Sequence, residues 1–215
     1  MLIDRYQEAI DNLLKKVSQT QRENIIKAGE IVADAVESGH KIYLGKVVHG
    51  IEMDLIHRGG GPIFYKPYNP EETELRPGDV LFVSSVSGRT KSVVDLAWDC
   101  MEKGVRVIAL TSMVYASHVE PVHESGKKLH EFVTLALDNC APAAEAMLEV
   151  EGIEAHYAAA SGISSDYIMW SLTSVCVEKM LRDGYTPGIL KSANFPGGND
   201  YNTNVIEPHY EEYGW

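Results

Sequence analysis

Three hydroxyl side chains and one glycine gather in the segment 85–90, between an apolar run and a pattern of helical spacing. The hydroxyls belong to Ser85, Ser87 and Thr90, and the glycine is Gly88. Residues 80–83 are all apolar and predict a buried strand, whereas apolar residues recur at helical spacing over 91–103. The free amides and positive dipole end of that helix would point into the loop. The segment therefore predicts a metal-free pocket for a tetrahedral oxyanion.

A simpler interpretation of the same loop is an ordinary helix cap. Ser and Thr are common before helices, where one hydroxyl accepts a hydrogen bond from a free amide. A cap uses only one side chain, whereas this loop offers three, so the anion pocket is favoured. A nucleotide-binding P-loop is not expected, because the lysine of the pattern G-x-x-x-x-G-K-[ST] is missing.

A second group of reactive side chains lies near a helix predicted over 51–58. Asp54 and Glu52 are carboxylates that could move a proton between adjacent carbons, if burial brings their pKa toward neutrality. His49 stands at the helix entrance and could donate a hydrogen bond or shuttle a proton. The alternatives stay open: Asp54 lies four residues before Arg58 and could form a surface ion pair, and His49 could be a solvent-exposed imidazole.

Alternating strand and helix patterns predict how these residues are positioned. Further strands are expected over 41–44, 63–65, 105–110 and 132–137, and further helices over 2–17, 19–38 and 164–182. This order predicts an α/β fold, a doubly wound αβα sandwich with a central parallel sheet of flavodoxin- or Rossmann-like type. One domain is expected over 1–215: N-terminal helices over 1–38, an α/β core over 39–190 and a C-terminal tail over 191–215. The first helix would either cover its own core or act as a dimerisation arm, and residues 194–204 carry too many turn formers for regular structure.

Ligands of parallel sheets bind beyond the carboxyl ends of the strands. Besides the segment 85–90, polar or small residues follow three other predicted strands: Gly45, the pair Thr111 and Ser112, and Asn139. These residues are expected to face one crevice.

Composition excludes several classes of function. The formal net charge of −12 disfavours nucleic-acid binding, because backbone phosphates would be repelled. The three cysteines, Cys100, Cys140 and Cys176, show neither a disulfide framework nor a metal-ligand spacing, and no pair of the histidines at 118, 123 and 130 has a zinc-ligand spacing. No signal peptide or membrane-spanning run is evident. We therefore expect a cytoplasmic protein without metal, cofactor, nucleic-acid partner or membrane partner.

The segment Ser85-Val86-Ser87-Gly88-Arg89-Thr90 resembles the S-x-S-G-x-[ST] loop of the sugar isomerase (SIS) family of phosphosugar-binding domains. The similarity to a bacterial subgroup of sugar isomerase domain proteins extends through further short motifs. These are Thr111-Ser112, His123-Glu124-Ser125-Gly126, Asp138-Asn139-Cys140, Ser192-Ala193-Asn194 and Gly197-Gly198. The resemblance implies the SIS fold, a small acidic sugar (phosphate or sulfonate) as ligand, and a homodimer or homotetramer with sites near subunit interfaces.

The resemblance also implies roles for individual residues. Asp54 aligns where isomerase relatives carry a catalytic Glu, and His49 and Glu52 are the other catalytic candidates. The implied substrate-binding residues are Gly45, Lys46, Ser85, Ser87, Gly88, Arg89, Thr90, Thr111, Ser112, His123, Asn139 and Asn194. The chain departs from its relatives in two places: the loop 45–49 is shorter and gains Lys46, and the helix from Ser164 lacks a histidine that ketose isomerase relatives use.

The leading hypothesis is therefore a sugar isomerase that interconverts an aldose and a ketose through an enediol, the sugar carrying a terminal phosphate or sulfonate. One alternative is a lyase, dehydratase or etherase acting on an amino-sugar 6-phosphate, which would begin with the same proton abstraction. The other is a non-catalytic subunit that binds a sugar phosphate.

Overall fold

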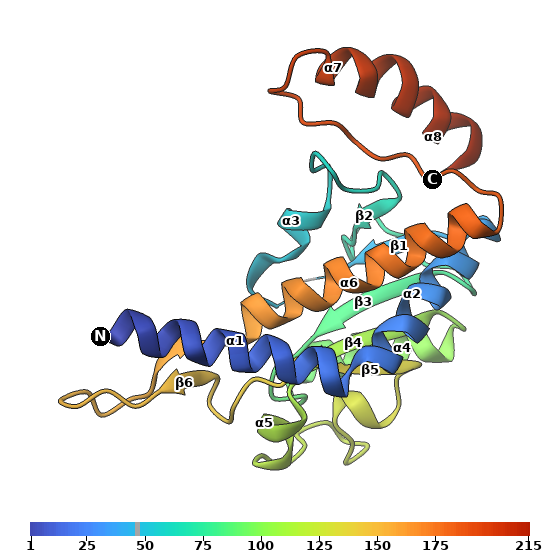
Figure 1. Ribbon diagram of the computed structural model, residues 1–215. Coiled ribbons are helices and arrows are strands. Elements are labelled where there is room, and N and C mark those ends of the chain that lie inside the picture. Colours follow the sequence, from blue (N-terminus) through green and yellow to red (C-terminus); the bar gives the residue numbers. More distant parts are fainter. Residues whose placement is uncertain (46–47) are drawn as a thin grey trace.

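The computed structural model describes residues 1–45 and 48–215. Five parallel strands form one sheet in the order β2-β1-β3-β4-β5, with helices on both faces (Figure 1). The sheet strands are β1 (Ile42–Leu44), β2 (Tyr65–Pro67), β3 (Val80–Ser84), β4 (Arg106–Thr111) and β5 (Leu135–Asp138). The helices are α1 (Leu2–Thr20), α2 (Arg22–Glu37), α3 (Glu52–Leu55), α4 (Lys91–Glu102), α5 (Met113–Ser117), α6 (Ser161–Arg182), α7 (Gly198–Tyr201) and α8 (Glu207–Tyr213). The predicted αβα sandwich is confirmed.

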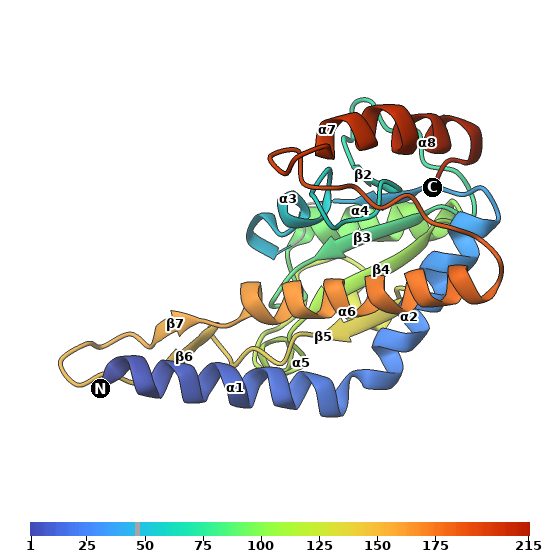
Figure 2. The same cartoon turned by 45° about the horizontal axis from the view of Figure 1, so that its top comes forward.

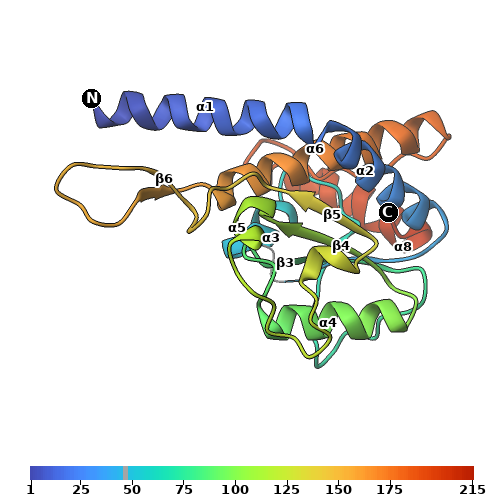
Figure 3. The same ribbon diagram turned by 90° about the horizontal axis from the view of Figure 1, so that it is seen from below.

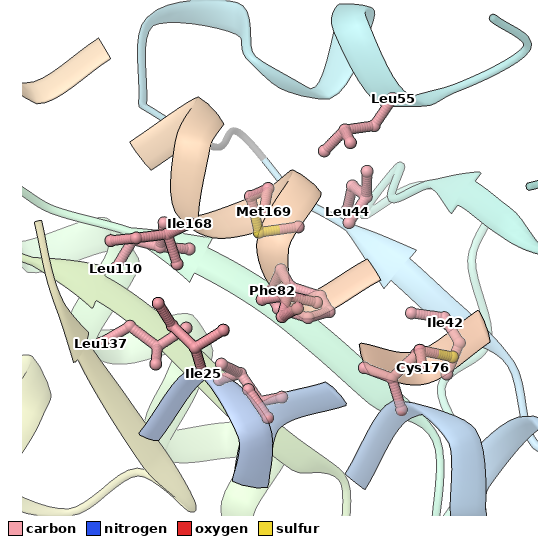
Figure 4. Packing of buried hydrophobic residues seen from close by; sticks show 14 of the residues in the cluster. Ile25, Ile42, Leu44, Leu55, Phe82, Leu110, Leu137, Ile168, Met169 and Cys176 are labelled. Atoms are coloured by element: carbon pink, nitrogen blue, oxygen red, sulfur yellow. The ribbon is translucent and has the colours of Figure 1, made fainter. Parts of the chain in front are cut away.

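The side chains of β3 and β4 point alternately to the two faces of the sheet, and this explains why helices cover both faces. Side chains on a strand point to opposite faces in turn, so a strand that is apolar throughout has both faces covered. Phe82 and its same-face neighbours pack against α2 and α6 (Figure 4), whereas Leu81 and Val83 pack against α4. Figure 3 shows α4 on one side of the sheet, with α2 and α6 on the other. The carboxyl ends of β1, β3, β4 and β5 consequently meet at one edge, as predicted.

Helices α2 and α6 approach closely at Gly29. A Cβ placed there would lie 2.6 Å from both the Leu172 carbonyl oxygen and the Val175 Cβ. The hydrogen side chain of glycine therefore permits this contact, which fixes α6 over the sheet.

The C-terminal segment corrects the prediction that 194–204 lacks regular structure. Helix α7 is followed there by a π-helical turn, η3 (Asn202–Ile206), and then by α8. The segment 188–190, which precedes these helices, forms backbone hydrogen bonds with residues 60–63. The Gly60 amide donates to the Leu190 carbonyl at 2.7 Å, and the Ile63 amide donates to the Gly188 carbonyl at 2.9 Å. These contacts cover the edge of the sheet at β2.

Several expected boundaries were wrong. The predicted helix 51–58 is reduced to the four residues of α3, preceded by a 3₁₀ turn, η1 (Val48–Gly50), because the backbone of Ile56 is extended. Strand β2 begins two residues later than expected, and β5 three residues later, after a 3₁₀ turn, η2 (Leu129–Glu131). A two-stranded antiparallel hairpin, β6 (Ala146–Leu148) and β7 (Tyr157–Ala159), was not predicted.

The hairpin and the beginning of α1 project together from the body of the molecule, as Figures 2 and 3 both show. Residues 1–8 are all exposed. The Arg5 guanidinium (Nη2) donates to the Glu149 carbonyl at 2.6 Å and ties the helix to the hairpin. We call residues 1–8 together with the hairpin 146–159 the arm.

Candidate functional site

The loop after β3 forms a tight turn at the carboxyl edge of the sheet. The Gly88 amide donates to the Ser85 carbonyl at 2.8 Å, and Gly88 has a φ of 68°, which favours glycine. A Cβ on Gly88 would meet Thr111 Oγ1 at 3.3 Å and His130 Nδ1 at 3.5 Å, so the turn also has little room for a side chain. This turn carries the hydroxyls of the segment to the start of α4.

The hydroxyls of the loop have different tasks. Ser85 Oγ is buried, lies 2.9 Å from Thr90 Oγ1 and accepts a hydrogen bond from the Thr90 amide at 3.2 Å, so it mainly fixes the loop. Ser87 is half-buried beside it. Thr90 is the N-cap residue of α4, but its side chain makes no cap hydrogen bond. Within the part of the chain that the structure describes, no side chain caps α4, so the amides of Lys91 and Ser92 at its start can donate to an anion.

A cavity of about 370 Å³ opens in front of this loop. We call it the hydroxyl pocket. Its described lining residues are His49, Ser84, Ser85, Val86, Ser87, Thr90, Tyr115 and Glu145. The three hydroxyl residues predicted from the sequence and His49 are thus brought together in one cavity.

Glu145 forms the wall of the hydroxyl pocket together with His49. His49 Nε2 lies 2.9 Å from Glu145 Oε1, and the Ser161 hydroxyl donates to the same oxygen. Within residues 1–45 and 48–215, the second oxygen, Oε2, has no hydrogen-bond partner. The carboxylate is therefore anchored through one oxygen, and the other is available to a ligand.

The hydrogen bonds also set the charge of Glu145. Burial raises the pKa of this carboxyl, but the hydrogen bonds from Ser161 and His49 outweigh burial and hold the pKa below its usual value. The side chain of Glu145 is 27% exposed and that of His49 is 64% exposed. Glu145 is thus an ionised carboxylate at neutral pH, next to an imidazole that solvent can reach.

Backbone strain marks the segment that presents Glu145. Ala144 and Glu145 have φ values of 58° and 73°, and His49 has 56°. Each such residue costs about 1–3 kcal/mol unless its surroundings hold it. Here the Glu145 amide donates to the Pro142 carbonyl at 3.0 Å, and the Ala160 amide donates to the Glu145 carbonyl at 2.9 Å.

Four other residues that were predicted to bind substrate lie at the same edge of the sheet, but each forms hydrogen bonds with other parts of the protein. Thr111 Oγ1 donates to the Val86 carbonyl at 3.3 Å, and Ser112 Oγ donates to the Ala141 carbonyl at 2.6 Å. Asn139 donates to Ser165 Oγ at 3.2 Å and is fully buried. Gly45 donates its amide to the Phe82 carbonyl at 2.9 Å and continues β1 along β3. These residues therefore hold the segments of this edge together, and none of the four is among the described lining residues of the hydroxyl pocket.

The carboxylates of α3 lie outside the described lining of the hydroxyl pocket. Asp54 forms an ion pair with Arg58 and accepts a hydrogen bond from Trp170 Nε1 at 3.2 Å. Glu52 is half-buried two residues earlier, at the start of α3. The ion pair named above as the alternative for Asp54 is therefore formed.

The remaining candidates are spread more widely. Arg89 is half-buried in the loop, whereas Lys46 lies outside the described residues. His123 packs on Trp98 of α4, with its Nε2 3.3 Å from Asp95. Asn194 lines a different cavity, of about 570 Å³, between residues 59–60 and the C-terminal segment.

Sequence reasoning missed Glu145 and Tyr115. Glu145 is the single acidic residue between Asp138 and Glu149, in the loop that follows the last strand of the sheet. That position could have identified it. Tyr115 reaches the pocket from α5. Ser112 caps this helix, because its Oγ accepts a hydrogen bond from the Tyr115 amide at 3.0 Å.

Within the described parts of the chain, no group of three or more His, Cys, Asp or Glu residues is arranged to hold a metal ion. None of the described helices is long and apolar enough to cross a membrane.

Comparison with known proteins gives a consistent set of relatives. The SIS domain family model matches residues 64–112, which include the hydroxyl loop. A UPF0309 protein of Shouchella clausii is 30% identical over 236 residues, covering 96% of this chain and 96% of that protein. A UPF0309 protein of a Geobacillus species is 28% identical, covering 97% of this chain and 96% of that protein.

Solved structures with the same fold are more distant in sequence. A phosphoheptose isomerase from Francisella tularensis is 14% identical with a TM-score of 0.57, covering 82% of this chain and 96% of that one. The structure of a Methanococcus jannaschii protein, described as inferring a function of 3-hexulose-6-phosphate isomerase, is also similar. That protein is 14% identical with a TM-score of 0.51, and the match covers 84% of this chain and 92% of that one. The Vibrio vulnificus NanR protein complexed with ManNAc-6P is 15% identical with a TM-score of 0.51 (99% and 70% covered).

Proposed function

This chain belongs to the UPF0309 family and contains a SIS domain, and from that premise we propose that it is a sugar isomerase acting on an aldose and a ketose with a terminal phosphate or sulfonate. The single observation that carries the proposal is the hydroxyl pocket. An ionised carboxylate and the hydroxyls that precede the uncapped N-terminus of α4 line one cavity of about 370 Å³. An acidic sugar has matching ends: a tetrahedral anion and a carbon chain that carries the reacting C–H bond.

The anion would lie between Ser87, Thr90 and the first amides of α4. Hydroxyls and amides bind a tetrahedral anion without a net positive charge, which suits a chain with a formal net charge of −12. Because a phosphate and a sulfonate have nearly the same shape, this binding mode accepts both.

Glu145 is the proposed base. Its free oxygen, Oε2, would take the proton from C2 of the aldose, and the electrons of that C–H bond would form the enediol. The same proton returns to C1, while His49 moves one proton between the oxygens on C2 and C1, so that atoms and charge balance. A carboxylate with a lowered pKa is a modest base but is present entirely in its basic form at neutral pH.

Asp54 is assigned a different role. Its pairing with Arg58 and Trp170 links α3 to α6. We propose that it supports the wall near His49 rather than carrying the proton.

The experiment is exchange of the C2 proton in deuterated water, followed by NMR, over a panel of aldose 6-phosphates and 6-sulfonates. The Glu145→Gln variant is expected to lose exchange by about 10²–10⁴-fold, the range typical of a removed general base. The matched control is Glu71→Gln, since Glu71 is exposed outside the pocket and away from the arm and should keep the wild-type rate.

Three results would count against the proposal. Wild-type exchange in Glu145→Gln would remove Glu145 from the chemistry. Binding of a sugar phosphate with no exchange in the wild-type chain would instead favour the non-catalytic binding subunit. An unsaturated product would favour the lyase.

A further inference from the structure

A second group of reactive side chains lies where the loop 123–127 packs against α4. Ser125 Oγ lies 2.7 Å from His123 Nδ1, and His123 Nε2 lies 3.3 Å from Asp95 Oδ1. None of these three residues is among the described lining residues of the hydroxyl pocket. A hydroxyl beside an imidazole that a carboxylate orients is the arrangement of an activated serine nucleophile.

The contacts of His123 determine which of its ring nitrogens carries the proton. The Ser125 amide donates to Nδ1 at 3.2 Å, so Nδ1 is an acceptor and has no proton of its own. The proton therefore lies on Nε2, which faces the Asp95 carboxylate, and the Lys91 ammonium holds that carboxylate at 2.8 Å. In this tautomer Nδ1 can take the proton of the Ser125 hydroxyl, as a general base must.

Packing holds the imidazole in place while the hydroxyl stays accessible. The side chain of His123 is only 8% exposed, and its ring centroid lies 5.5 Å from that of Trp98 on α4. Ser125 is exposed, so a small acyl compound can reach its oxygen from solvent. The Lys127 amide donates to Ser125 Oγ at 3.2 Å and would stabilise the negative charge that develops there as the proton leaves.

Another serine and histidine of the same chain are adjacent but lack this arrangement. Ser117 Oγ lies 3.2 Å from His118 Nδ1, but that nitrogen also lies 2.7 Å from the Val114 carbonyl oxygen. Because a carbonyl only accepts, Nδ1 of His118 carries the proton and cannot act as a base toward Ser117. The Ser117 hydroxyl donates to the same carbonyl at 2.7 Å. Ser117, which is also exposed, is therefore a matched serine without activation.

We propose that Ser125 is a nucleophile that accepts an acyl group from a small activated acyl donor, an aryl ester or a thioester. Ser125 Oγ bonds to the carbonyl carbon, and its proton passes to His123 Nδ1. The bond from that carbon to the leaving oxygen or sulfur then breaks, and the leaving group takes the proton from Nδ1. The products are an acylated serine and a phenol or thiol, and water restores the serine by the same steps. This activity is independent of the proposed sugar isomerisation.

The test incubates the full chain with p-nitrophenyl acetate. Release of p-nitrophenol measures the rate of acyl transfer, and mass spectrometry of peptides locates the acetyl group. The wild-type chain should be acetylated at Ser125 and not at Ser117. Ser125→Ala should lose the acetylated peptide together with the fast release of p-nitrophenol, whereas Ser117→Ala keeps both. His123→Gln should slow acetylation of Ser125 by about 10²–10⁴-fold, the range typical of a removed general base.

Asp95 acts through His123 and is a positioning residue. Asp95→Asn should slow acetylation, because an amide does not hold the proton on Nε2, and Asp95→Glu should restore the rate by returning a carboxylate. Circular dichroism checks that the variants are folded. No acetyl group on Ser125 of the wild-type chain, or equal acetylation of Ser117 and Ser125, overturns the proposal without any variant. An unchanged rate in His123→Gln overturns it as well.

Discussion

Glu145 carries its charge in a partly buried position because Ser161 and His49 both bond to one of its oxygens. Burial raises the pKa of Glu145, but these two hydrogen bonds lower it by more, so the pKa lies below that of the same carboxyl in the unfolded chain. A group whose pKa is lower in the folded state stabilises that state above its unfolded pKa. This stabilisation is lost as the pH falls through the folded pKa.

The free energy of unfolding should therefore differ between wild type and Glu145→Gln in a pH-dependent way. The variant should be less stable at pH 7, and the difference should shrink as the pH falls below about 4.3. Urea unfolding followed by tryptophan fluorescence at several pH values measures this difference. Glu71→Gln, at an exposed position away from the pocket, is the control that should show no such difference. A gap that widens toward low pH would contradict the assigned hydrogen bonds.

Ser87 is the hydroxyl of the loop that is least committed to the loop itself, since Ser85 and Thr90 bond to each other. Ser87→Ala should raise KM for the acidic sugar by about 10–100-fold, because a hydrogen bond to a charged group contributes about 1.5–3 kcal/mol. The turnover number should change little, since anion binding is shared by ground state and transition state. Ser174→Ala, exposed on α6, is the control. Equal losses in kcat and kcat/KM would assign Ser87 to the chemistry instead.

The residue scale also shows how far the sequence could predict the site. Adjacent residues in 85–90 form the anion loop, so its chemistry is visible in one stretch of sequence. Glu145 and His49 are 96 residues apart and meet through the order of the strands. Asp54 and Arg58 had the spacing of an ion pair, and the pair forms even though α3 ends at Leu55. Short-range patterns thus predict local contacts, whereas the partner of His49 depends on the folded chain.

At the scale of elements, the close approach of α2 and α6 supports the sheet face below the site. Gly29→Ala should lower the free energy of unfolding by about 1–3 kcal/mol, because a methyl group there would collide with the backbone and side chain of α6. Gly162→Ala is the matched control, since a Cβ there meets nothing within 4 Å and alanine favours helix. Urea unfolding decides between them: equal stability of Gly29→Ala and wild type would contradict the packing.

Elements with strong apolar patterns were predictable, and those fixed by contact with distant segments were not. The core strands β3 and β4 and the helices α2, α4 and α6 appear close to their predicted places. The region 198–206 is helical although it contains one glycine and three asparagines, and it buries Ile206. In the following helix, α8, the ring centroid of Tyr210 lies 5.1 Å from Nζ of Lys66 on the edge strand β2. Tertiary contact thus outweighs weak local propensity, and it explains the missed hairpin as well.

For the whole molecule, the formal net charge of −12 opposes the approach of an anionic sugar. The account therefore depends on a local arrangement of dipoles, because Thr90, the N-cap residue of α4, and Glu145 line the same pocket. The fold brings these groups together from β3, the loop after β5 and the turn after β1. The composition disfavoured a nucleic-acid partner, whereas the position of the carboxylate required the structure.

The most direct measurement is a crystal structure of the Glu145→Gln variant with a bound aldose 6-phosphate. The account predicts the phosphate at Ser87, Thr90 and the first amides of α4, with C2 within about 3.5 Å of the residue-145 side chain, the separation of reacting atoms before proton transfer. A phosphate bound elsewhere on the chain, or a sugar whose C2 faces away from residue 145, would contradict it.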